Sequence, residues 1–251
     1  MDTIIQILAR ELGRSEAHVE NVVRLIDEGN TIPFIARYRK ELHGAMDDTA
    51  LRTLADRLQY LRNLDKRREE VKSAIEGQGK LTEELSAAID AAATLAEVED
   101  LYRPYRQKRR TRATVAREKG LEPLAELLFA QAADGPAPEE AAGAFVDPEK
   151  GVETAEDALQ GASDIIAERI SDDADIRKRL RELVWKKGYL VSAAAAKEPE
   201  DTVYRLYYAF RSPLNRVQGH QVLAINRGER EGVLKVSVEM EREAALIPVR
   251  R

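Results

Sequence analysis

Apolar side chains recur at helical spacing along most of the chain, and short polar residues and glycines mark where helices begin and end. The longest pattern covers residues 49–76, where one narrow apolar stripe is interrupted near Arg68. The stripe consists of Leu51, Leu54, Leu58, Leu61, Leu64, Val71 and Ile75. Asp47 or Asp48 precedes it as an N-cap, and Gly77 follows it. The sequence therefore predicts a long central helix on which shorter helices pack.

Shorter amphipathic patterns predict further helices on both sides of this long one. They cover residues 2–12, 15–28, 82–93, 95–101, 113–133, 154–170 and 171–187. The region 113–133 is expected to be a helix pair, broken near Gly120 and Pro123. The last two patterns are joined by a tight turn, which is typical of a helix-turn-helix unit.

The pattern changes after Gly219 to one that is typical of β-strands. Residues 221–225 and 233–240 are β-like, and the turn-rich segment 226–232 lies between them. This predicts a C-terminal β-hairpin. Two strands alone cannot bury a face, so we expect the hairpin to belong to an incomplete further domain, near whose start the chain ends.

These patterns together predict a mainly α fold: a multi-helical N-terminal scaffold with a long central helix, a helix-turn-helix-like unit and a C-terminal β-hairpin. The expected divisions are 1–150 for the helical region, 151–200 for the helix-turn-helix-like unit, and 201–251 for a linker and the hairpin. A chain of 251 residues is long enough to bury a sizeable core.

Composition narrows the class of protein. Hydrophobic residues make up 43% of the chain, too many for a disordered protein, and the chain contains no cysteine for disulfides or thiolate metal sites. There is no signal peptide pattern and no apolar run of membrane-spanning length, so we expect a cytoplasmic protein without membrane contact.

Catalytic chemistry has little support in the sequence. No phosphate-binding loop and no nucleophile motif occurs. Glu97 and Asp100 can share a helix face, but no further ligand completes a metal site. His43, directly before Gly44, is expected to be a turn residue rather than a base. We therefore predict a protein that is not an enzyme and that has no catalytic residues, no metal and no cofactor.

Charge is unevenly distributed, and this draws attention to one segment. The formal net charge is −5, yet residues 103–119 hold eight basic residues and one acid. The candidate nucleic-acid-binding residues are Arg103, Arg106, Lys108, Arg109, Arg110 and Arg112. Such side chains neutralise phosphates, and Tyr102 and Tyr105 either stack on bases or anchor the core. A clamp that pairs with the chain's own acids or holds other domains, and a plain solvated loop, remain open alternatives.

The helix expected over 171–187 is a second candidate, since a recognition helix there would offer basic residues to a DNA groove. These are Arg177, Lys178, Arg179, Arg181, Lys186 and Lys187. However, Asp172, Asp173 and Asp175 crowd its start and repel phosphate. We therefore favour a packing or protein-interaction unit over DNA readout, with Trp185 in the core.

Three strings carry a family resemblance: GNTIPFIARYRKELHG (29–44), EDLYRPYRQKRRTRAT (99–114) and HQVLAINRGEREGVLKV (220–236). In this order they resemble the N-terminal part of the Tex family, bacterial transcription accessory proteins related to a eukaryotic transcription elongation factor. The resemblance covers essentially the whole chain. It implies a helical N-terminal region with a helix-turn-helix-like unit, and a role in nucleic-acid binding and gene expression without known catalysis. It also implies that 201–251 leads to a ribonuclease-H-like domain of the YqgF type, with helix-hairpin-helix and S1 modules further on.

The function predicted from these observations is that of a non-enzymatic, nucleic-acid-associated transcription accessory factor, of which this chain is the N-terminal scaffold. The basic segment would contact phosphates of single-stranded RNA or DNA with low affinity and without sequence preference. The alternative is a protein-interaction scaffold that holds the other domains or the transcription machinery and has no affinity for nucleic acid.

Overall fold

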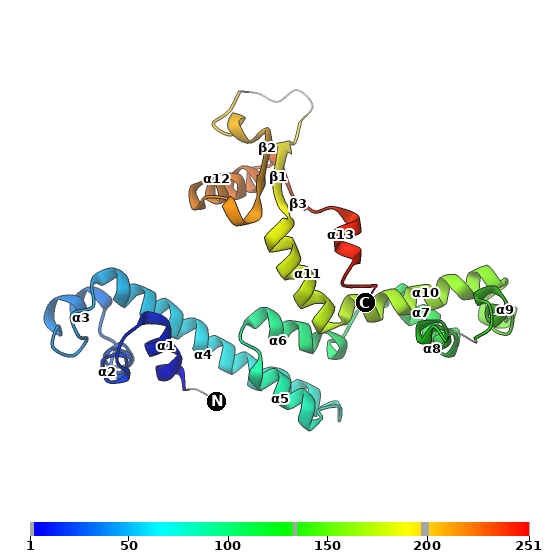
Figure 1. The fold of residues 1–251 in the computed structure, drawn as a ribbon, viewed down its shortest axis with the longest axis horizontal. Coiled ribbons are helices and arrows are strands. Elements are labelled where there is room, and N and C mark those ends of the chain that lie inside the picture. The colour runs from blue at the N-terminus through cyan, green and yellow to red at the C-terminus, as the bar shows by residue number, and fades with distance from the viewer. Residues whose placement is uncertain (1–2, 133–134, 197–200, 251) are drawn as a thin grey trace. The chain divides into compact units, whose positions relative to one another are not determined.

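The computed structural model describes residues 3–132, 135–196 and 201–250, and it confirms a mainly α fold with a small antiparallel sheet (Figure 1). The chain forms two compact units, Met1–Tyr105 (unit 1) and Arg106–Arg251 (unit 2). The domain boundaries expected at residues 150 and 200 stay predictions.

Unit 1 is built along its longest helix, α4. Its helices are α1 (Ile4–Leu12), α2 (Glu16–Asp27), α3 (Ile32–Tyr38), α4 (Asp48–Glu76), α5 (Glu83–Ala91) and α6 (Leu95–Tyr102), followed by a 3₁₀ turn (Arg103–Tyr105). Helices α1, α2 and α3 lie along the first half of α4, and α5 and α6 lie along the second half (Figure 1).

The apolar stripe of α4 forms the core of unit 1, as predicted: the same seven residues are its buried positions. The N-cap is Asp47, whose carboxylate accepts a hydrogen bond of 2.7 Å from the backbone N–H of Ala50. Arg68 fills the gap in the stripe. Its guanidinium donates to the carbonyl of Ala92 at 2.7 Å and to Asp65 at 2.5 Å, so it ties α4 to the end of α5.

The turn between α3 and α4 buries a histidine. His43 lies in this turn, as expected, and is only 1% exposed, and neither ring nitrogen has a hydrogen-bond partner in the part of the chain that the structure describes. Gly44 follows with φ of +59°, and a Cβ atom there would lie 2.3 Å from Nδ1 of His18. The turn therefore requires glycine at position 44.

Replacing His43 by leucine is expected to raise the free energy of unfolding by about 1 kcal/mol, because buried nitrogens without partners cost desolvation that an apolar side chain avoids. Urea titration followed by far-UV circular dichroism measures the change. His220→Leu, at an exposed position, serves as the control and should leave stability unchanged. A marked loss of stability in His43→Leu would show that the imidazole has a partner.

Unit 2 begins with four helices, of which the first three pack around the fourth, α10. They are α7 (Arg112–Glu118), α8 (Glu122–Ala130), α9 (Pro138–Gly143) and α10 (Ala155–Asp172). Most of the buried residues in this core are alanines, and the largest are Leu121, Leu124 and Ile165. Gly161 of α10 permits the close packing, since a Cβ atom there would lie 2.3 Å from Cδ1 of Leu121.

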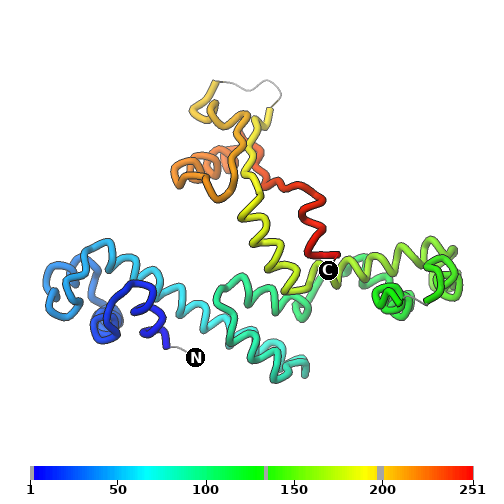
Figure 2. The backbone as a smooth tube through the Cα atoms, in the orientation of Figure 1, coloured from blue at the N-terminus to red at the C-terminus, as the bar shows by residue number. Residues whose placement is uncertain are grey.

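The second part of unit 2 is a three-stranded sheet with helices around it. Its elements are α11 (Ala174–Lys187), β1 (Tyr189–Ala194), β2 (Ala209–Pro213), α12 (Gly219–Arg230), β3 (Leu234–Glu239) and α13 (Arg242–Leu246). The strand order is β2-β1-β3, and both pairings are antiparallel. The backbone passes from α11 through Gly188 directly into β1 (Figure 2).

The predicted hairpin is wrong in its first strand. Residues 221–225 lie in α12, and β3, which confirms most of the second predicted strand, pairs with β1 instead. A short apolar run fits a helix as well as a strand. In the structure these residues lie in a helix of 12 residues, and at its start the backbone N–H of Gln218 donates to the Gln221 side chain at 2.9 Å.

The helix pair expected over 154–187 is confirmed as α10 and α11. Asp173 lies between them and caps α11, accepting a hydrogen bond of 2.8 Å from the backbone N–H of Ile176. The prediction that Trp185 lies in the core is wrong, since its exposed fraction is 60%. The reason is that α11 buries none of its residues, so its apolar positions do not face a core.

Candidate nucleic-acid interface

The basic segment crosses the boundary between the two units. Arg103 belongs to the last turn of unit 1, and the other five predicted residues belong to unit 2. Residues 107–110 form an irregular stretch that ends at Thr111, the N-cap of α7. The Thr111 hydroxyl accepts a hydrogen bond of 3.1 Å from the backbone N–H of Thr114, which fixes the point where the segment enters the helix.

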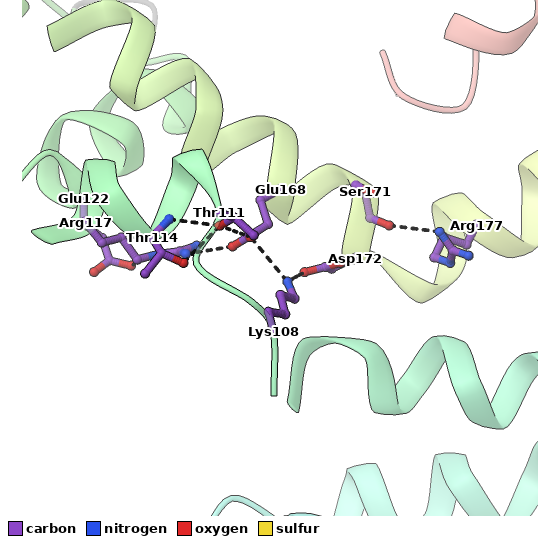
Figure 3. Close-up of polar contacts among 9 residues, drawn as sticks. All are labelled: Lys108, Thr111, Thr114, Arg117, Glu122, Glu168, Ser171, Asp172 and Arg177. Carbon is purple, nitrogen blue, oxygen red and sulfur yellow. Dashed lines mark hydrogen bonds and ion pairs between the residues drawn. The ribbon is translucent and has the colours of Figure 1, made fainter. Parts of the chain in front are cut away.

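Two carboxylates of α10 hold one side of this segment (Figure 3). Glu168, which is 15% exposed, accepts hydrogen bonds from Arg117 at 2.7 Å and from the Thr111 hydroxyl at 3.0 Å. Lys108 lies 3.6 Å from Glu168 and donates to Asp172, one turn further along α10. The Lys108 ammonium is therefore held between two acids of its own chain.

The charge of Glu168 is stabilised in this position. Burial alone would raise the pKa of Glu168, but the hydrogen bonds from Arg117 and Thr111 and the charge of Lys108 outweigh it, and the pKa is lowered. The same hydrogen bond raises the pKa of Arg117. Both groups are thus ionised at neutral pH, and they join the last turn of α7 to α10.

Three other cations of the segment face solvent. Arg109 is exposed and forms no ion pair with any described residue. Arg110 pairs with Glu118 at 2.7 Å, but both side chains are more than half exposed. Arg112 is 86% exposed, and its only ion-pair contact among the described residues, with Asp164, is long at 3.7 Å. Exposed pairs of this kind contribute little energy and exchange readily for another anion.

The remaining predicted residues, Arg103 and Arg106, are also exposed. The two tyrosines are not. Tyr102 and Tyr105 are half-buried against the core of unit 1, and the Arg67 guanidinium lies over the Tyr102 ring at 5.5 Å. This arrangement supports the interpretation of both tyrosines as core anchors rather than as platforms for base stacking.

Helix α11 keeps the acidic start that the sequence indicates. Asp173 caps the helix and Asp175 lies in its first turn, while Arg177 donates to the carbonyl of Ser171 at 3.3 Å (Figure 3). Carboxylates at a helix N-terminus repel phosphate. The end that a recognition helix usually presents to bases is therefore the less suitable end of α11.

Two further kinds of feature, a metal site and a membrane-spanning helix, are not found in the residues that the structure describes. Within residues 3–132, 135–196 and 201–250, no three His, Asp or Glu side chains are grouped so that they could hold a metal ion. No helix in these ranges combines the length and the apolar character that crossing a membrane demands.

The fold and the basic segment define a mainly helical protein with a local cationic surface. Comparison with protein families is consistent with this class: residues 2–76 match the Tex-like protein N-terminal domain, and residues 134–248 match the Tex central region. The chain therefore belongs to the Tex family and comprises its N-terminal and central regions.

Individual relatives span bacteria and humans. The chain is 48% identical to the uncharacterized protein YdcI of Bacillus subtilis over 236 residues, which is 93% of this chain and 33% of YdcI. It is 40% identical to the transcriptional accessory protein Tex of Neisseria gonorrhoeae over 239 residues, 95% of this chain and 31% of that protein. It is 32% identical to human S1 RNA-binding domain-containing protein 1 over 246 residues, 94% of this chain and 24% of that protein. The chain thus spans about a third or less of these relatives.

Proposed function

We propose that this chain is the non-enzymatic, nucleic-acid-associated scaffold of a transcription accessory factor, and that Arg109, Arg110 and Arg112 contact the phosphates of single-stranded RNA or DNA. The observation that carries the proposal is that the cations of the basic segment differ in their surroundings. Lys108 is held by Asp172, whereas the three arginines present their charge to solvent. The names of two relatives, a transcriptional accessory protein and an S1 RNA-binding domain protein, support the same class of function.

The hydrogen bonds that hold residues 108–111 against α10 are expected to favour binding. Lys108 and Thr111 tie both ends of a four-residue stretch to α10, so the arginines between and beside them lose less conformational freedom when they bind. Contacts to phosphate alone carry no sequence information. The whole chain has a net charge of −5 although residues 103–119 contribute +7, so the remainder carries −12. Binding is therefore expected to be local, weak and independent of sequence.

The combined variant Arg109→Ala/Arg110→Ala/Arg112→Ala tests this assignment. With a fluorescein-labelled 20-nucleotide oligouridine, we expect affinity to fall about tenfold at moderate salt, and the slope of log K against log salt to fall by about two units, because each phosphate contact on a single strand contributes ~0.7. Fluorescence anisotropy at several salt concentrations measures both quantities.

A matched control removes the same charge from other exposed places. Arg52, Arg205 and Arg227 are more than half exposed and pair with acids on their own helix or turn. Their combined replacement by alanine should change affinity and salt slope much less. Equal losses in both triple variants would mean that net charge alone matters, and would remove the assignment to residues 109–112.

The second candidate function is a protein-interaction scaffold without affinity for nucleic acid, holding other domains or the transcription machinery. The contact of Lys108 with Asp172 and Glu168 favours it, since this cation is already engaged. Failure of the unmodified chain to bind the oligonucleotide even at low salt would select this function. The cytoplasmic location expected from the sequence stays a prediction.

A further inference from the structure

An exposed tryptophan ends helix α11. Trp185 is 60% exposed, although large aromatic side chains are usually buried. Its support is rigid: the N–H of Gly188 donates to the carbonyl of Val184 at 2.7 Å, and the N–H of Leu214 donates to the carbonyl of Gly188 at 3.0 Å. Gly188 is packed so closely that a Cβ atom there would lie 2.5 Å from the Val184 oxygen. The ring is thus presented to solvent from a well-fixed helix end.

The two residues of α11 that follow this ring in the sequence are cationic. Lys186 and Lys187 follow it, are exposed, and form no ion pair with any residue that the structure describes. Both line an open pocket of about 650 Å³, whose wall does not include Trp185. Tyr189 and Arg211 also line it, and the Arg211 guanidinium lies 3.6 Å from the centre of the Tyr189 ring.

Two carboxylates also belong to the wall of this pocket. Glu239 lies 3.9 Å from Arg211, so its charge is matched by that guanidinium. Glu241 precedes α13 as its N-cap residue. Three cations and two acids therefore share the wall of this pocket. The two lysines that follow Trp185 in the sequence are the groups best able to accept a new anion.

We propose that Trp185 is a base-stacking platform for single-stranded nucleic acid, and that Lys186 and Lys187 contact the phosphates next to the stacked base. Proteins that bind single strands combine positive charge with exposed aromatic rings. Residues 109–112 supply charge only, because Tyr102 and Tyr105 pack against the core of unit 1. Trp185 is an exposed aromatic ring elsewhere in unit 2. The inference rests on the proposed function for the class of its ligand.

The base is the part of the ligand that this site recognises. Bases in a duplex are already stacked on one another, whereas those of a single strand can leave their neighbours and cover the indole ring. The site therefore discriminates single strands from duplexes. An apolar protein partner would gain nothing from the two exposed lysines.

Trp185 is the only tryptophan of the chain, so its emission reports on this ring alone. Titration with a 20-nucleotide oligothymidine should quench the emission, because stacking brings the base onto the indole. A duplex of the same length and inorganic polyphosphate, which has no bases, should leave the emission nearly unchanged at matched phosphate concentration. Unchanged emission at saturation with oligothymidine, or equal quenching by polyphosphate, would overturn the stacking site.

Substitutions at the ring provide an independent measurement by anisotropy. Trp185→Ala should weaken oligothymidine binding about tenfold, while Trp185→Phe, which keeps an aromatic face, should retain most of the affinity. Lys186→Ala/Lys187→Ala should lower the salt slope by about one unit. Because these side chains are exposed, far-UV circular dichroism should match that of the unmodified chain. Equal affinity of Trp185→Ala and the unmodified chain would contradict the inference.

The triple arginine variant separates this inference from the proposed function. If that variant binds normally while oligothymidine still quenches Trp185, the assignment to residues 109–112 fails and the stacking site stands. If the variant loses affinity while emission of the unmodified chain never changes, the stacking site fails and the arginine contacts stand. Absence of any binding at low salt would overturn both.

Discussion

Leu124→Ala in α8 is expected to lower the free energy of unfolding of unit 2 by about 3 kcal/mol. Leu124 is fully buried in a core that consists mainly of alanines. Neighbouring side chains that end at Cβ cannot move into the space that leucine leaves. The substitution therefore costs both the lost burial of the side chain and the cavity that it leaves, and the cost of the cavity rises when a site cannot collapse.

Leu127→Ala on the same helix is the matched control. It removes the same atoms from a side chain that is 41% exposed, and should cost less than about 1 kcal/mol. Urea titration followed by far-UV circular dichroism measures both variants. Equal losses at positions 124 and 127 would contradict the packing of α8 described above.

Glu168→Gln is expected to destabilise unit 2 by about 2 kcal/mol at neutral pH, because it leaves Arg117 and Lys108 partly buried without their shared negative charge. Glutamine can still accept the hydrogen bond from Thr111, so the variant isolates the effect of charge. Thermal unfolding monitored by circular dichroism measures the loss. The exposed pair Arg169–Glu126 gives the control: Glu126→Gln should cost about 0.5 kcal/mol or less.

The effect of Glu168→Gln is expected to depend on pH in a defined direction. The pKa of Glu168 is lowered from its ordinary value of 4.5 in the folded chain. Its contribution is therefore fully present above about pH 4.5 and is lost as pH falls through the lowered pKa. The difference in stability between the unmodified chain and the variant should shrink in acid. A difference that stays constant down to pH 3 would show that the charge of Glu168 is not responsible.

The helices were the most predictable part of this molecule. In α4 the seven apolar positions read from the sequence are the seven that are buried. The spacing of apolar residues over this length fits the period of a helix and not that of a strand, and Asp47 and Gly77 mark the ends of the helix. Ser15 and Thr154 precede α2 and α10 and cap them in the same way, each accepting a hydrogen bond from a backbone N–H of the first turn.

The sheet was the least predictable part. Strands β1 (YLVSAA) and β2 (AFRSP) carry no distinct alternation of apolar and polar residues, unlike β3 (LKVSVE). Their pairing is decided by contacts between residues far apart in sequence. The exposure of Trp185 could not be predicted for a related reason. Large apolar side chains are usually buried, and the sequence does not show that α11 buries none of its residues.

For the candidate site, the sequence shows which residues are positively charged, but it does not show which acids their side chains contact. The sequence shows that Lys108 and its neighbours are cationic, and it leaves open whether they meet the chain's own acids. The partner of Lys108, Asp172, lies 64 residues away. Only the packing of α7 against α10 brings the two together, and it is this packing that separates Lys108 from the solvent-facing arginines.

Strand β1 lies in the middle of its sheet, so it can complete its hydrogen bonds only after β2 and β3 have been synthesised. Tyr189 opens β1, yet it pairs with Pro213 on one side and with Glu239 on the other. During synthesis, the helices before β1 can fold from local contacts while the strand waits for both edges. The three strands should therefore be the last part of this chain to gain protection against hydrogen exchange during refolding, and until then β1 offers two unsatisfied edges to any extended chain nearby.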